Sequence, residues 1–66
     1  MNEPHGPVHI TCELTRPQAF ALAELCKRIG WTDVRSNAAS DTEALNMIAA
    51  TEHVRSALEQ GGVAVR

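Results

Sequence analysis

Apolar and polar residues alternate without a break between positions 8 and 14, and the apolar positions are Val8, Ile10, Cys12 and Leu14. Successive side chains of a β-strand point to opposite faces, so this pattern predicts a strand with one buried face and one solvated face. The breakers Pro4 and Gly6 come before it, in a stretch with little apolar content. We therefore expect residues 1–6 to form a flexible N-terminal arm and residues 7–66 to form a single small domain.

A helical pattern begins directly after this strand. Thr15 and Gln18 have the spacing of a capping box, and Pro17 stands in the first turn, where its missing N–H costs nothing. The helix is expected to run to about residue 29. Gly30 then predicts a Schellman-type stop, with Trp31 as the apolar residue that closes over the helix end.

At about 100° per residue, the apolar face of this first helix consists of Leu22, Leu25, Cys26 and Ile29. Phe20 falls nearly opposite that face. The favoured interpretation is that Phe20 folds back onto the neighbouring strand or loop. A small domain buries little apolar surface, so it needs to bury its only Phe. The alternative is that Phe20 is an exposed contact residue.

Within segment 31–39, residues 32–35 fit a short helical turn capped by Thr32 or a short strand, and a turn or a brief 3₁₀ piece is favoured. A second helix begins after Ser40, which forms a capping box with Glu43, and it continues to about Gln60, where Gly61-Gly62 ends it. Its first half is apolar nearly all round. Such a helix is covered on two sides within the domain or half covered by a partner.

Residues 63–66, with the sequence Val-Ala-Val-Arg, predict a second short strand. The order of elements is then strand, helix, helix, strand. This order predicts an α+β fold in which two antiparallel helices pack on one face of a small antiparallel sheet. Because two strands alone are marginally stable, a third strand from segment 31–39 or from a second chain would complete the sheet.

Composition narrows the classes of function. Sixty-six residues, 44% of them apolar, suit one folded domain. A net charge of −2 gives no basic stripe for nucleic acid and no polybasic membrane surface. The first residues lack the basic and apolar regions of a signal peptide, and the two cysteines fit a reducing compartment. We therefore expect a cytoplasmic protein that contacts neither a membrane nor nucleic acid directly.

The side chains that could do chemistry do not form a catalytic set. Cys26 stands near the C-terminal end of its helix, where the helix dipole disfavours a thiolate, and Cys12 occupies an apolar strand position. His5, His9 and Cys12 have metal-like spacing, but a strand points His9 and Cys12 to opposite faces. We expect no catalytic residue, no metal and no cofactor.

A protein-binding surface remains, and it has two kinds of candidate residue. The apolar candidates are Phe20, Trp31, Leu45 and Ile48. They are apolar residues in addition to those that a helix with one buried face needs. The acidic candidates are Glu13, Asp33, Asp41, Glu43 and Glu52, which could occupy a basic groove meant for nucleic acid if they share a face.

The segment Leu14–Ala23, together with the capping pattern, size and layout of residues 8–66, resembles small proteins encoded on phages and other mobile elements of proteobacteria. Within that class the chain is similar to anti-CRISPR inhibitors of type I CRISPR–Cas complexes. The resemblance implies a non-enzymatic inhibitor in a bacterial host. Such an inhibitor would bind a Cas subunit and block DNA binding through a partly acidic surface.

Two other functions fit the same sequence. One is a homo-oligomeric accessory domain that associates through Leu45 and Ile48. The other is a small DNA-linked regulator that acts as a dimer, although the charge balance speaks against it.

Overall fold

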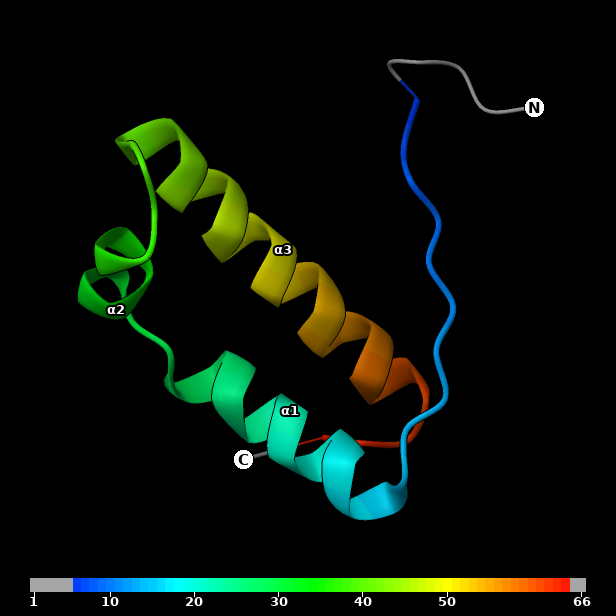
Figure 1. Cartoon of the computed structure of the whole chain (residues 1–66). Coiled ribbons are helices and arrows are strands. Elements are labelled where there is room, and N and C mark those ends of the chain that lie inside the picture. Colours follow the sequence, from blue (N-terminus) through cyan, green and yellow to red (C-terminus); the bar gives the residue numbers. More distant parts are fainter. Residues whose placement is uncertain (1–5, 65–66) are drawn as a thin grey trace.

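Three helices form the protein in a computed structural model that describes residues 6–64. Helix α1 spans Arg16–Arg28, α2 spans Trp31–Ser36 and α3 spans Asp41–Gln60. The two long helices run in opposite directions, and α2 lies at the end where they diverge (Figure 1). Helix α3 packs against both α1 and α2, so it is the central element of the fold.

The predicted α+β fold is wrong, because residues 6–64 contain helices and no strand. Residues 7–14 are extended, but no backbone hydrogen bond joins them to the rest of the described chain. Val8 is 83% exposed and Ile10 is 80% exposed, so the face that was expected to be buried is open. Alternation marks a segment that could pair, but a strand also needs a neighbouring strand.

No neighbouring strand comes from the C-terminal residues that were expected to supply it. Val63 takes part in ending α3 and Ala64 has no regular structure, while residues 65 and 66 lie outside the described part of the chain. Residues 1–5 of the expected N-terminal arm lie outside it as well.

Helix α1 begins as the sequence predicts. The Thr15 N–H donates to Gln18 Oε1 at 2.9 Å, and the Gln18 N–H donates to Thr15 Oγ1 at 3.2 Å. This capping box satisfies two of the backbone groups that a helix N-terminus leaves unpaired. The helix ends at Arg28, one residue before the expected end.

The stop after α1 differs from the prediction. Gly30 has φ −107° and ψ 175°, which is extended backbone, so the expected Schellman-type stop is absent. Gly30 instead caps the start of α2, and Trp31 is the first residue of that helix. Segment 31–36 is therefore an α-helix, where a turn or a brief 3₁₀ piece was expected.

The end of α3 is a complete Schellman motif, as the glycine pair suggests. The Gly62 N–H donates to Glu59 O at 3.0 Å, and the Val63 N–H donates to Leu58 O at 2.8 Å. Gly62 has φ +92°, a conformation that L side chains rarely adopt. The motif turns Val63 back over Leu58, and both residues line the groove described below.

Replacing Gly62 with Ala is expected to lower the free energy of unfolding by about 1–2 kcal/mol, because a Cβ disfavours positive φ. Urea unfolding followed by circular dichroism measures the change. Gly61→Ala is the matched control. Gly61 has φ −82°, and a Cβ there would meet Leu58 O at an ordinary 3.4 Å. Equal losses in the two variants would contradict this explanation of the helix end.

The core of the described chain is built from small residues. The buried hydrophobic residues are Ala19, Ala23, Cys26, Val34 and Ala44. No large side chain among residues 6–64 is fully buried. Small residues let the helices approach closely, but each removes little apolar area from water. The larger apolar side chains therefore lie around the core instead of inside it.

Candidate protein-binding surfaces

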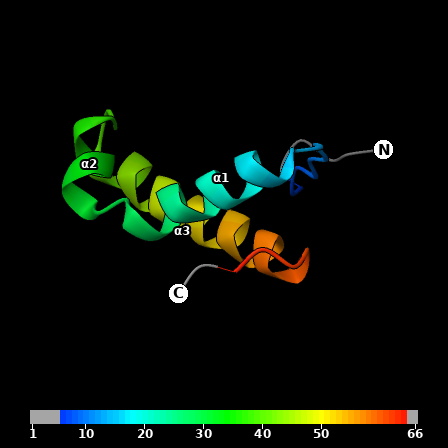
Figure 2. The same cartoon turned by 90° about the horizontal axis from the view of Figure 1, so that it is seen from below.

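A groove of about 650 Å³ lies between the N-terminal segment, the start of α1 and the end of α3. Its apolar lining includes Ile10, Leu14, Leu22, Val54, Leu58 and Val63. Helix α1 crosses α3, and the N-terminal segment leaves the helices at the first turn of α1 (Figure 2). One wall of the groove is therefore a segment that has no backbone hydrogen bonds of its own within the described chain.

The expected apolar face of α1 is only partly covered. Cys26 is buried as predicted, but Leu25 is 57% exposed, and Leu22 and Ile29 are half-buried. The residues that α1 buries besides Cys26 are Ala19 and Ala23. The covered face is thus rotated toward the small residues, which allow a closer approach than Leu does. Leu22 and Leu25 of α1 therefore lie at the edge of the contact between the helices, where solvent reaches them.

The four apolar candidates from the sequence are all at least partly accessible. Leu45 is 62% exposed, Trp31 is 46% exposed and Phe20 is 39% exposed, while Ile48 is half-buried. Phe20, which the favoured interpretation folds back onto the neighbouring strand or loop, is therefore partly covered and partly accessible. Leu45, which lies outside the main apolar face of α3, is therefore not covered by the rest of the described chain.

Leu25, Trp31 and Leu45 are exposed large apolar residues on three different helices. The end of α1, all of α2 and the start of α3 lie on the same side of the molecule, with α2 between the other two (Figure 1). We call these three residues the α2-end surface. Leu25 was not among the predicted contact residues, because its position on the amphipathic face of α1 indicated burial.

Three acidic candidates make local contacts: Asp33 does so at the start of α2, and Asp41 and Glu43 do so at the junction of α2 and α3. Asp33 Oδ2 accepts a hydrogen bond from the Gly30 N–H at 3.4 Å. Asp41 Oδ1 pairs with Arg35 Nε at 2.6 Å. The Glu43 carboxylate accepts from the Ala39 N–H at 2.8 Å.

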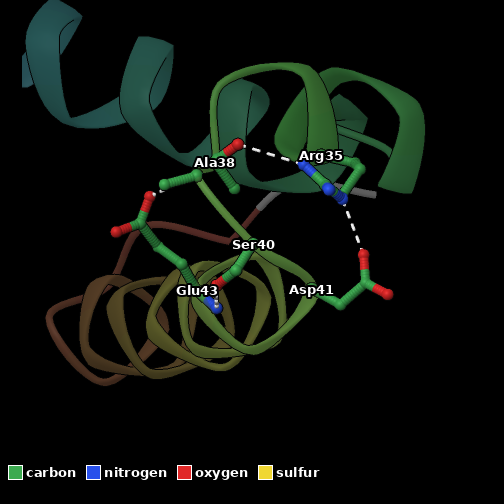
Figure 3. A network of polar contacts seen from close by, with 6 residues as sticks. Arg35, Ala38, Ser40, Asp41 and Glu43 are labelled. Atoms are coloured by element: carbon green, nitrogen blue, oxygen red, sulfur yellow. Dashed lines mark hydrogen bonds and ion pairs between the residues drawn. The ribbon is translucent and has the colours of Figure 1, made fainter.

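This junction forms a small polar network (Figure 3). Arg35 donates to Ala38 O at 3.0 Å in addition to its pairing with Asp41. The Glu43 N–H donates to Ser40 Oγ at 3.1 Å, which is the first half of the predicted capping box. The second half is shifted by one residue, because Glu43 reaches the Ala39 N–H instead of that of Ser40. These contacts fix the entry of the chain into α3.

The remaining acidic candidates do not join this group. Glu13 is exposed in the N-terminal segment, and Glu52 is exposed in the middle of α3. Neither forms an ion pair within residues 6–64. Of the five carboxylates, one thus caps the start of α2, two hold the junction of α2 and α3, and two lie at separate exposed positions.

The cysteines are free and lie in different environments. Cys26 is buried, whereas Cys12 is exposed, so the expected burial of Cys12 is wrong. Across the described residues, no group of three or more His, Cys, Asp or Glu side chains has the geometry to hold a metal ion. No helix of residues 6–64 is both long enough and apolar enough to cross a bilayer.

The fold and these surfaces define a small helical protein with a minimal core and apolar side chains left at its rim. The chain belongs to DUF7706, a family of unknown function whose model matches residues 1–66. No curated protein and no solved structure matches the chain.

Proposed function

We propose that this protein is a non-enzymatic binding domain that acts by occupying a surface of a larger protein assembly. The observation that carries the proposal is the α2-end surface, where Leu25, Trp31 and Leu45 are 57%, 46% and 62% exposed. Exposed large apolar residues are candidates for interaction sites, and Trp side chains that a partner buries contribute strongly to binding. A protein partner would remove this apolar area from water.

The apolar surface supports the proposal better than the acidic residues do. Asp33 and Glu43 accept backbone hydrogen bonds, and Asp41 pairs with Arg35. A carboxylate that caps a helix cannot give up that contact without cost to the fold. The whole chain also carries a charge of only −2. We therefore assign the binding energy to the apolar residues, and we assign a structural role to the carboxylates of Asp33, Asp41 and Glu43.

The partner that we propose is a type I CRISPR–Cas surveillance complex. The support for this narrower proposal is the resemblance of the chain to small anti-CRISPR proteins in size and composition. An inhibitor of this kind would bind a Cas subunit and keep target DNA from that complex. It would do so as a stoichiometric binder.

The test measures binding of labelled target DNA to a purified type I complex with and without the protein. Micromolar protein is expected to reduce DNA binding, and Leu25→Asp and Leu45→Asp are each expected to weaken inhibition about tenfold or more. Ala50→Asp is the matched control, because Ala50 is an exposed residue of α3 outside the α2-end surface.

Three outcomes would count against the proposal. Absence of inhibition at micromolar concentration would remove the CRISPR–Cas partner. Equal inhibition by Leu45→Asp and the unchanged protein would remove the α2-end surface from the contact. A shift of DNA by the protein alone would favour a DNA-linked regulator instead.

A further inference from the structure

The N-terminal segment has the alternating sequence of a strand and runs as a drawn-out trace away from the helices (Figure 1), but it lacks a partner. Residues 7–14 are extended, and none of their backbone groups is paired within the described chain. Unpaired backbone groups beside an exposed apolar face are a template for another strand. We propose that residues 8–14 of two copies of this chain pair as an antiparallel ribbon and thereby close the groove at the end of α3.

The exposed area of the chain supports a second copy as the occupant. A folded monomer of 7.1 kDa is expected to expose about 4,100 Å². This chain exposes 5616 Å². The excess of about 1,500 Å² is larger than the roughly 800 Å² that each partner contributes to a stable interface of standard size.

The dimensions of the molecule lead to the same conclusion. Its radius of gyration is 13.4 Å. A compact domain of this length is expected to have a radius of about 11 Å. The chain extends 37 × 32 × 15 Å, so it is flat, and seven of its larger apolar residues are exposed. A second copy would supply the missing cover without any other molecule.

The alternation of the segment fits a symmetric pairing. In an antiparallel pair, Val8, Ile10, Cys12 and Leu14 of both copies would lie on one face of the ribbon. Ile10 and Leu14 already line the groove together with Leu58 and Val63. That face would cover the groove. Thr11 also lines the groove in the single chain, and the pairing would turn its side chain toward solvent together with His9 and Glu13. A twofold axis makes such an interface the same for both copies.

The ends of the segment define the register. Pro7 has no N–H to donate, and the Thr15 N–H is already bound by Gln18 Oε1 at 2.9 Å. Residues 8–14 can therefore pair along their full length, and the middle of this stretch is Thr11. Antiparallel pairing of the full stretch places Thr11 opposite its own copy on the twofold axis. This interface is separate from the α2-end surface, so it does not depend on the proposed function.

The first measurement is the mass of the full chain in solution by light scattering. We expect twice the chain mass of 7.1 kDa. Ile10→Asp is expected to yield monomers, because it places a charge on the covered face of the ribbon. His9→Asp is the matched control on the solvent face of the same segment, and it should remain dimeric. A monomer at 100 μM, or equal loss of dimer in both variants, would overturn the proposal.

A crosslinking experiment tests the register and does not depend on the fold of a destabilised variant. In a Cys12→Ser background, Thr11→Cys is expected to form an intermolecular disulfide, because residues directly opposite in an antiparallel pair are about 4.5–5.5 Å apart at Cα. Glu13→Cys is expected to remain reduced, since its copy would be four residues away along the ribbon. Crosslinking of Glu13→Cys as fast as Thr11→Cys would contradict the pairing. A monomer with protected amides in residues 8–14 would show that the segment folds onto its own helices instead.

Discussion

Replacing Ala44 with Leu is expected to lower the free energy of unfolding by about 1–3 kcal/mol. Ala44 is 0% exposed, and it is the one residue of α3 that is buried within the described chain. Helix α3 packs against both other helices, so it cannot move away from one without disturbing the other. Three additional heavy atoms at this position would force the helices apart or force a strained rotamer.

Ala50→Leu is the matched control, since Ala50 lies on the same helix and is exposed. Both substitutions replace Ala with Leu, a residue of similar helix propensity, so the difference between them isolates packing. Chemical unfolding monitored by circular dichroism gives both free energies. If Ala44→Leu and Ala50→Leu have the same stability, the small-residue contact does not set the distance between the helices.

The features that the sequence predicts correctly are local. The capping box of Thr15 and Gln18 and the glycine stop of α3 depend on residues within one turn of each other. Their spacing alone determines the hydrogen bonds. The position of Gly30 was interpreted wrongly because a glycine can follow one helix or precede the next. Only the conformation of the residues after it distinguishes the two.

The fold class could not be predicted from the alternation of residues 8–14. Alternation indicates that one face of a segment can be buried, but it does not indicate which part of the structure covers that face. Within the described chain nothing pairs with the segment, and Val8 and Ile10 remain 83% and 80% exposed. The same pattern would describe a strand within a monomer or a strand completed by a second copy.

The candidate surface was predictable in part. The all-round apolar character of α3 correctly indicated that Leu45 exceeds what the core requires. Leu25 was missed, because helical periodicity gives equal weight to Leu and Cys on one face. The structure buries Cys26 and leaves Leu25 57% exposed. Residue size decides how closely two helices approach, and hydrophobicity alone does not contain that information.

The midpoint of thermal unfolding is expected to rise with protein concentration, because a dimer that unfolds to two free chains is stabilised by mass action. A hundredfold increase in concentration adds about 2.7 kcal/mol to the free energy of unfolding. For a dimer of two 66-residue chains, this corresponds to a rise of about 10 °C in the midpoint. Circular dichroism melts between 2 and 200 μM cover this range.

Ile10→Asp gives the contrast that links this concentration dependence to the N-terminal segment. Its midpoint is expected to be lower than that of the unchanged protein and the same at every concentration, whereas His9→Asp should keep the slope. An unchanged protein with a constant midpoint would mean that three helices and five small buried residues are stable alone. A slope that persists in Ile10→Asp but is lost in Leu45→Asp would move the self-interface to α3. The segment 8–14 would then be open to a different partner.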